Sequence, residues 1–198
     1  FWLKLLPSRP NKGPGLRPRS HFAVRGTSPP LAAVDMAMVK EDLLTLIDMS
    51  TLECLNQKEG FPVANAFTVD DSFLESDTDH QLLVKVEFRQ PVKLSGVRVW
   101  GVDADSAPTT VKVFQNKPHI GFAEAENEEP TELLNFGPEE VEKGEEKTVR
   151  FVRFQCVSTL QIFIEENQGD EVTKIKRISL VGQPAQAMDM KDWKPTKG

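Results

Sequence analysis

The chain has 198 residues, 39% hydrophobic and 27% charged, which is enough for one globular domain with a substantial core and terminal extensions. Residues 1–38 carry six basic residues and one acidic residue, a net charge of +5, whereas the remainder carries 18 basic and 29 acidic residues, a net charge of −11. An acidic body argues against nucleic acid or an anionic membrane as the main partner, because both repel it, and no apolar run approaches the roughly 18 residues of a membrane span.

Residues 1–38 are predicted to be disordered, because prolines and glycines interrupt each apolar run. The segment is basic, contains serine and is poor in acid, as organelle transit peptides are, but it lacks a methionine at position 1. The interpretation that we prefer is an upstream extension from a gene-model error, with Met36 or Met38 as the true start. A transit peptide would place the protein in an organelle; an extension leaves it in the cytoplasm and also the nucleus.

The expected domain begins at residue 39 with a segment that suits a short helix. Its apolar residues include Leu43, Leu44 and Ile47, and the polar turn-forming residues that follow limit its length. Residues 61–67 form a compact apolar segment, and residues 70–80 are acidic and turn-like.

Strands are predicted where apolar and polar residues alternate or β-branched residues gather, between turn-forming residues. These segments are residues 82–88, 92–100, 109–114, 132–136 and 174–181. The acidic stretch 122–130 and the turn-rich stretch 137–147 are predicted to be connections.

The rest of the chain is predicted to be organised around residues 149–170. Apolar and polar residues alternate over residues 152–156, and after a short polar break at Ser158 and Thr159 the apolar residues Leu160, Ile162 and Ile164 alternate with Gln161 and Phe163. This pattern predicts an antiparallel hairpin. Residues 165–170 are all polar or turn-forming, and a loop that follows a buried strand is a common place for binding groups.

About seven or eight short strands with little helix indicate an all-β fold, a β-sandwich or jelly roll, over residues 39–184. The sequence shows no βαβ alternation, internal repeat or coiled-coil heptad. Residues 185–198 are predicted to be a polar C-terminal tail.

Signatures of catalysis are missing from the sequence. It contains no dinucleotide-binding, P-loop or nucleophile-elbow motif. His80 follows Asp77 and Asp79, and such a loop can bind a metal ion, but solvated turn residues are the commoner explanation. Glu165 and Asp170 offer carboxylates for acid–base chemistry without a partner at a matched spacing. The residues alone therefore indicate an acidic binding module with no enzymatic activity, metal or cofactor.

The two cysteines, Cys54 and Cys156, do not form a disulfide framework or a CxxC pair. Both lie in apolar runs, so two buried, reduced thiols are the favoured interpretation. The alternative is a single disulfide between them across the sandwich. A redox-sensing thiol at Cys54 is a further alternative, but no cation lies near it in sequence to lower its pKa.

Several separated stretches resemble the PITH domain, the proteasome-interacting C-terminal domain of thioredoxin-like protein, which also occurs in free-standing PITH domain-containing proteins. Together they cover roughly residues 40–184 in the family's order. The stretches are IDMSTLECLNQ, FPVANAF, LESDTDHQLLVKVEF, PVKLSGVRVWG, PTTVKVFQNKP and VRFVRFQCVSTLQIFIEENQGDEVTKIKRISLVGQP.

The resemblance implies a jelly-roll β-sandwich of the galactose-binding-like type and a protein-binding module that docks on the 26S proteasome. No thioredoxin domain or CxxC pair precedes the PITH segment in this sequence, so the resemblance is to a stand-alone PITH protein, expected to be a monomer. The candidate partner-binding residues are the polar ones of two loops: Asp77, Asp79, Glu165, Glu166, Asn167, Gln168 and Asp170.

The alternative is a small-ligand or metal-binding, lectin-like domain, because galactose-binding-like sandwiches often hold ligands at one loop end. Asp77, Asp79 and Asn167 would be its polar groups. This alternative depends on an analogy between folds.

Overall fold

The structure, a computed structural model, describes residues 40–185, and residues 1–39 and 186–198 lie outside this range. The chain divides into two units, Phe1–Asp35 and Met36–Gly198, and the described residues all belong to the second. The predicted disorder of residues 1–38 and the predicted tail, apart from Ala185, therefore fall outside the described residues. Within residues 40–185, no helix is long and apolar enough to cross a membrane.

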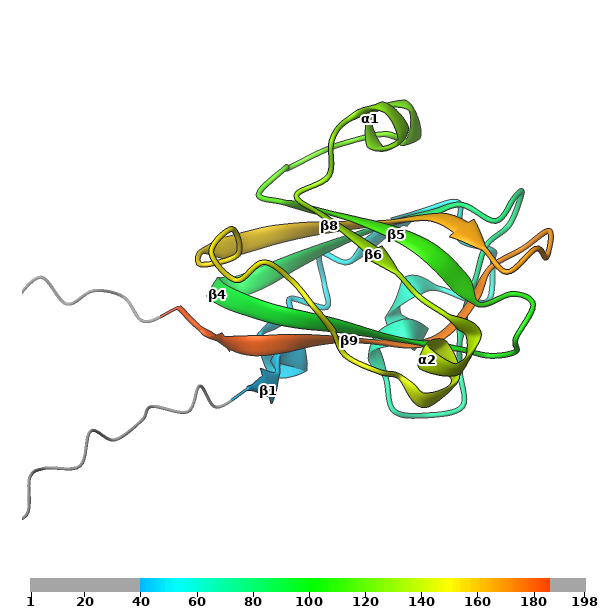
Figure 1. The fold of residues 1–198 in the computed structure, drawn as a ribbon, viewed down its shortest axis with the longest axis horizontal. Coiled ribbons are helices and arrows are strands. Elements are labelled where there is room, and N and C mark those ends of the chain that lie inside the picture. The colour runs from blue at the N-terminus through cyan, green and yellow to red at the C-terminus, as the bar shows by residue number, and fades with distance from the viewer. Residues whose placement is uncertain (1–39, 186–198) are drawn as a thin grey trace, which may run out of the picture. The chain divides into compact units, whose positions relative to one another are not determined.

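Antiparallel strands make up most of the described domain (Figure 1). The main path through the sheet runs β1-β9-β4-β8-β5-β6, while β2 and β7 pair with β4, and β3 pairs with β9. In chain order the elements are β1 Glu41–Asp42, the 3₁₀ helix η1 Leu43–Leu46, β2 Glu53–Leu55, the 3₁₀ helix η2 Val63–Phe67, β3 Leu74–Glu75, β4 Leu82–Gly101, β5 Pro108–Gln115, α1 Phe122–Asn127, β6 Glu132–Asn135, α2 Pro138–Lys143, β7 Lys147–Thr148, β8 Val157–Asn167 and β9 Lys174–Pro184.

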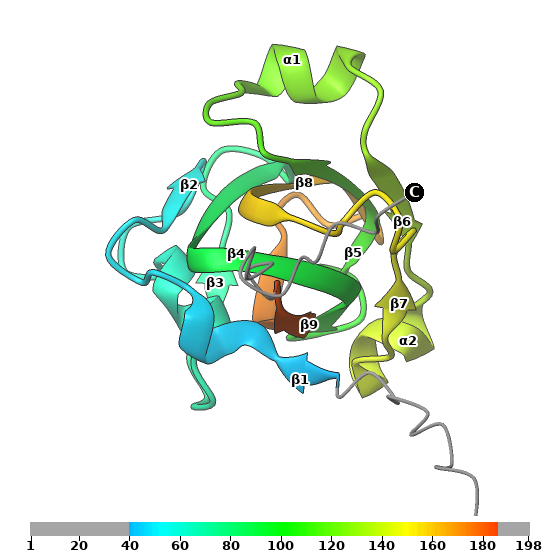
Figure 2. The ribbon, with the colours of Figure 1, turned by 90° about the vertical axis from the view of Figure 1, so that its left-hand side faces the viewer.

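The long strand β4 belongs to both layers of the sandwich. Residues 82–87 pair with β8, and residues 92–101 pair with β9. The register shifts between Glu87 and Val92, around Pro91, which has no amide hydrogen to donate to a neighbouring strand. The two strands predicted at 82–88 and 92–100 are therefore one continuous strand. It carries the sheet from one layer to the other, and the sheet curls around the core (Figure 2).

Hydrophobic side chains fill the space between the layers. The largest cluster includes fully buried residues of β4, β8 and β9, among them Leu82, Val84, Leu160, Ile162, Ile164 and Leu180. A second, smaller core contains Leu83, Phe114, Ala125 and Phe163, with Phe122 of α1 packed against it. Because β8 is buried on both faces, residues 160–164 are all buried, and the strand does not have the single buried face that was predicted.

The predicted hairpin over residues 152–164 is wrong. Strand β8 runs through Ser158 and Thr159, where the turn was expected. The Asn116 side chain defines the beginning of β8, because it accepts from the Ser158 amide at 2.9 Å and donates to the Cys156 carbonyl at 2.8 Å. Residues 149–156 form a connection with a turn, in which Val152 is 87% exposed.

Two short helices lie in stretches that were predicted to be connections. Helix α1 begins after Gly121, whose amide donates to the Glu124 side chain at 2.8 Å, and α2 begins after Gly137, whose amide donates to Glu140 at 2.7 Å. Gly144 ends α2 with a φ of 65°, in the left-handed region. Each helix has six residues, too few to show a helical period in the sequence.

The helix predicted after residue 39 is reduced to one 3₁₀ turn. Asp42 caps this turn, because its carboxylate accepts from the Leu44 amide at 2.9 Å. Ile47 already forms a bridge to Phe88 of β4, so the chain returns to extended backbone before a longer helix can form. The strands predicted at 109–114, 132–136 and 174–181 correspond to β5, β6 and β9.

Candidate functional site

Three connections meet at one end of the sandwich, on the right of Figure 1, and we call this the loop end. It comprises residues 76–81, 102–107 and 168–173, together with residues 165–167, which were predicted to belong to a loop but form the end of strand β8. The buried Thr173 joins the first and third connections, because its hydroxyl donates to the His80 carbonyl at 2.7 Å. The connection 168–173 is joined to the connection 102–107 because the Gln168 backbone amide donates to the Ala107 carbonyl at 3.0 Å. The loop end is therefore one cross-linked surface.

Asn56, directly after β2, holds the connection that contains Asp77 and Asp79. Its side-chain amide donates to the Asp79 carboxylate at 2.8 Å and to the Gln81 carbonyl at 2.7 Å, and its oxygen accepts from the Thr78 amide at 3.0 Å. The backbone of Asn56 has a φ of 66°, a conformation that asparagine tolerates better than most residues. This turn is thus fixed by a residue outside it.

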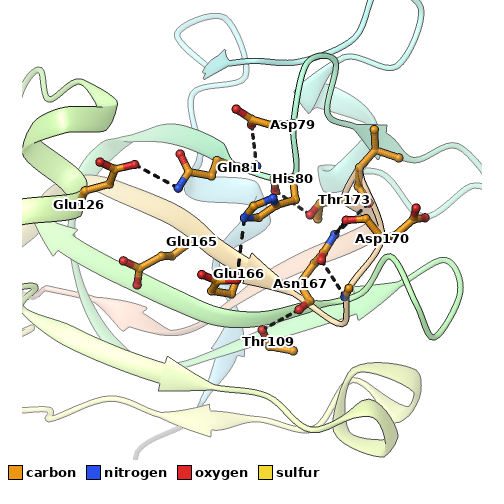
Figure 3. A network of polar contacts seen from close by, with 12 residues as sticks. Asp79, His80, Gln81, Thr109, Glu126, Glu165, Glu166, Asn167, Asp170 and Thr173 are labelled. Carbon is orange, nitrogen blue, oxygen red and sulfur yellow. Dashed lines mark hydrogen bonds and ion pairs between the residues drawn. The ribbon is translucent and has the colours of Figure 1, made fainter.

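Asn167 organises the connection after β8 in a similar way (Figure 3). Its side-chain amide donates to the carbonyls of Asp170 and Val172 at 3.0 and 3.1 Å, and its oxygen accepts from the Gly169 amide at 2.9 Å. Gly169 has a φ of 121°, which only glycine adopts readily. The hydrogen-bonding groups of Asn167 are consequently used to shape the loop.

The two glutamates that precede Asn167 have different partners. Glu166 lies beside His80, with 3.9 Å between Oε2 and Nε2, and the Glu166 side chain is 63% exposed (Figure 3). Glu165 instead forms an ion pair with Lys112 of β5, with 2.6 Å between Glu165 Oε1 and Lys112 Nζ. The same ammonium also donates to the Glu126 carbonyl at 2.9 Å. The side chains of Lys112 and Glu165 are only 11% and 26% exposed, so this pair links strands β5 and β8 and presents little charge to solvent.

The remaining candidate residues contribute to the loop end through their backbones. The amide of Asp77 donates to the Asn56 carbonyl at 2.9 Å, and that of Asp170 to the Asp105 carbonyl at 3.4 Å. The structure thus brings the two predicted loops to one surface. Its exposed acidic residues are Asp77, Asp79, Asp103, Asp105, Glu166 and Glu171.

The arrangement offers little for metal or acid–base chemistry. Among residues 40–185, no group of three or more histidine, cysteine, aspartate or glutamate side chains is placed to hold a metal ion. One Asp79 carboxylate oxygen already accepts from Asn56 and from the Gln81 amide, at 2.8 and 2.9 Å. The loop end is built to present a surface of fixed shape and negative charge.

Both cysteines are free thiols, and the expectation of two buried thiols is wrong for Cys156, which is exposed. Cys156 lies in the connection before β8, because the predicted strand there does not form. Cys54 is half-buried and packs against the main core, and desolvation by this burial raises its pKa to about 12. A neutral thiol of this kind is a poor nucleophile, so Cys54 is not built as a redox sensor.

Sequence reasoning missed three residues on which the loop end and its surroundings depend: Asn56, Lys112 and Thr173. Asn56 carried a signal, since a lone asparagine after a short apolar run is typical of a left-handed position. No local sequence pattern marks Lys112 or Thr173, because their partners, Glu165 and His80, lie 53 and 93 residues away in the chain.

Comparison with known families gives a match over most of the chain. The sequence model of the PITH domain family matches residues 34–197. The chain is 38% identical over 166 residues to "Thioredoxin-like protein 1" of Schizosaccharomyces pombe, covering 78% of this chain and 56% of that protein. It is 36% identical over 152 residues to "PITH domain-containing protein 1" of Xenopus laevis, covering 73% of this chain and 71% of that protein. The chain therefore spans little more than half the length of the first relative.

Solved structures resemble the fold at low sequence identity. The family 32 CBM from Clostridium perfringens NanJ, solved in complex with galactose, matches with a TM-score of 0.54 and 10% identity. The match covers 72% of this chain and 99% of that one. At this identity the likeness concerns the fold alone, and it confirms the predicted galactose-binding-like β-sandwich.

Proposed function

The chain belongs to the PITH domain family, and we propose that it is a non-enzymatic protein-binding module whose partner is the regulatory particle of the 26S proteasome. The family match over residues 34–197 carries this proposal, because it supports a protein-interaction module, and the proteasome is the partner expected from the resemblance of the sequence to the PITH domain of thioredoxin-like protein. The name of the Xenopus relative describes a domain and not a reaction, in keeping with a binding role.

The geometry of the loop end supports a protein contact. Hydrogen bonds among its three connections fix the backbone before a partner arrives, so little conformational entropy is lost on binding. Its exposed carboxylates, Glu166 and Glu171 among them, favour a basic patch on the partner, and long-range attraction between such surfaces speeds association. We therefore place the contact on the loop end.

The test uses the full 198-residue chain with purified 26S proteasome, the regulatory particle alone and the 20S core alone. Co-sedimentation at low salt is measured for the parent and for a Glu166→Lys, Glu171→Lys variant. Both side chains are exposed, so the fold should tolerate the change, whereas Glu165→Lys would place a second cation against Lys112. A Glu41→Lys, Glu129→Lys variant is the matched control, with the same charge change at exposed positions away from the loop end.

We expect the parent and the control to sediment with the 26S and regulatory particles but not with the 20S core. The loop-end variant should bind at least about tenfold more weakly, because two attractive charges become repulsive. If neither the parent nor the control sediments with any particle, the proposed partner is wrong. If all three chains bind alike, the partner stands and the loop end is not the contact.

The small-ligand alternative receives less support from the structure. Two of its three polar groups, Asp79 and Asn167, already form hydrogen bonds within the loop end. Thermal-shift measurements with calcium and with galactose test it directly, and a rise in melting temperature with either would revive it.

A further inference from the structure

A groove beside the loop end is formed by the end of β4, the connection 102–107 that follows it, helix α2, the connection after η2 and the beginning of β9. It consists of two adjoining hollows of about 290 and 470 Å³, which share Gly101, Val102 and Glu142 as lining residues. The larger hollow is also lined by Thr68, Val69, Asp70, Trp100, Lys176 and Arg177. None of the candidate residues of the loop end lines either hollow.

The groove exposes apolar surface that the domain does not need for its own core. Val69 and Val102 are 75% and 43% exposed, and they are two of six large hydrophobic side chains exposed among residues 40–185. The half-buried Trp100 is held in place, with the Arg177 guanidinium 5.4 Å from the ring centre on one side. Gly144 contacts the indole so closely that a Cβ there would lie 1.8 Å from Trp100 Cε2. The groove thus has a rigid aromatic wall and an open aliphatic edge.

The charges that line the groove do not balance. Its carboxylates are Asp70, Asp103, Glu139 and Glu142, against two basic residues, Lys176 and Arg177. Both basic residues already have acidic partners outside the groove, Asp71 at 3.3 Å and Asp42 at 3.2 Å.

Two of the four carboxylates also have basic partners: Asp103 pairs with Lys174 at 3.5 Å and Glu139 with Lys143 at 3.1 Å. Within residues 40–185, Asp70 and Glu142 form no ion pair with a basic side chain, and both line the larger hollow. The hydroxyls of Ser72 and Thr68 donate hydrogen bonds to the Asp70 carboxylate, and these bonds lower the pKa of Asp70. Two carboxylates without basic partners therefore face the same space as Trp100, Val69 and Val102.

From this combination we propose that the groove binds a short peptide segment of a partner protein in which basic side chains alternate with aliphatic ones. The aliphatic side chains contact Val69, Val102 and the free edge of Trp100, and the basic ones approach Asp70 and Glu142. Arginine and lysine suit this space because their aliphatic stems pack on apolar surface while the charged ends reach carboxylates. The groove shares part of the connection 102–107 with the loop end, but none of the candidate partner-binding residues lines it. The proposal is tested with isolated peptides, so its failure can be distinguished from failure of the proteasome proposal.

The test follows the indole N–H signals of the full chain by NMR during a peptide titration. The chain has three tryptophans, and a Trp100→Phe variant identifies the Trp100 signal by its loss. The probes are three blocked hexapeptides in which leucine alternates with arginine, with glutamine or with glutamate. An Asp70→Asn, Glu142→Gln variant removes both charges while keeping the shape of each side chain. A Glu41→Gln, Glu129→Gln variant is the matched control.

We expect the arginine peptide alone to shift the Trp100 signal saturably, and more weakly as salt is added. The Asp70→Asn, Glu142→Gln variant should raise its dissociation constant about tenfold, the combined effect of two partly exposed ion pairs, and the control should leave it unchanged. Equal binding of the glutamine peptide, or no response of Trp100, would overturn the proposal. A Trp100 signal that moves with salt in the peptide-free protein, and not with peptide, would also overturn it.

Discussion

The side-chain amide of Asn56 donates a 2.8 Å hydrogen bond to the carboxylate of Asp79, which lies 23 residues later in the chain. This contact joins the end of β2 to the connection before β4. Because Asn56 also binds the Gln81 carbonyl and the Thr78 amide, one side chain determines the conformation of residues 78–81. The candidate partner-binding surface therefore depends on a residue that lies outside its own connections.

An Asn56→Ala variant should lose about 2–4 kcal/mol of stability, from the broken hydrogen bonds and from the strain of alanine at a positive φ. Asn56→Gly removes the same hydrogen bonds but adopts the backbone freely, so it should be about 1 kcal/mol less destabilising than alanine. Urea unfolding of both variants separates the two causes. Equal losses for alanine and glycine would mean that the backbone conformation contributes nothing.

A Thr173→Val variant should lower the free energy of unfolding by about 1–2 kcal/mol, because valine keeps the buried shape but leaves the His80 carbonyl without its hydrogen-bond donor. Thr148→Val in β7 is the control, since Thr148 is exposed and should change stability by less than about 0.5 kcal/mol. Chemical unfolding measures both, and a similar effect at the two positions would contradict the bridging role of Thr173.

The Lys112–Glu165 pair should show a coupling energy of about 1 kcal/mol in a double-mutant cycle of Lys112→Met and Glu165→Gln. Its low exposure weakens solvent screening compared with the Glu139–Lys143 pair on α2, whose side chains are 83% and 58% exposed. The matching cycle on α2, with Lys143→Met and Glu139→Gln, should give no more than about 0.5 kcal/mol. A coupling at α2 as large as that at Glu165 would show that burial is not the reason.

Thiol labelling at about pH 8 should distinguish the two cysteines, because the thiolate is the reactive form. Cys156 is exposed and should react fast, whereas burial raises the pKa of Cys54 to about 12 and should make it slow. A Cys156→Ser variant should retain only the slow phase, which accelerates in urea as the core opens. A fast phase that persists in this variant would show that Cys54 is accessible.

Stability should also respond to the protonation of Asp103. The Ser106 hydroxyl, with help from the Ser106 amide and Lys174, lowers the pKa of Asp103 below its ordinary value of 3.8. The ionised carboxylate therefore stabilises the fold above pH 3.8, and this contribution is lost as the pH falls through the lower pKa of the folded state.

An Asp103→Asn variant should accordingly be less stable than the parent at about pH 6, and the difference should shrink as the pH falls below 3.8. Because the Asp103 side chain is 46% exposed, the difference should be small. Urea midpoints across this range measure it, with Asp105→Asn as the control for the same charge change on the same loop. A difference that grows towards low pH would contradict the direction of the pKa change.

The all-β class and the positions of most strands could be predicted from the amino-acid sequence alone. Alternating apolar residues and turn-forming residues encode strands locally, and they identified β5, β6 and β9 without reference to tertiary contacts. The stretches that resemble the PITH domain likewise identified the family from local sequence alone. The polar stretches at 77–79 and 165–170 lie at one end of the sandwich, although residues 165–167 belong to strand β8 and not to the predicted loop.

Where a strand begins or ends, and which polar side chains come into contact, depend on tertiary contacts. Residues 152–156 alternate like a strand but remain a connection, because the Asn116 side chain, about 40 residues earlier in the chain, determines where β8 begins. The helices α1 and α2 are too short to produce a period, and capping glutamates hold them. Glu165 and Glu166 are neighbours in sequence, yet Glu165 forms a largely buried ion pair with Lys112, whereas Glu166 is exposed to solvent beside His80. Such differences arise from contacts between residues far apart in the chain, which no local pattern records.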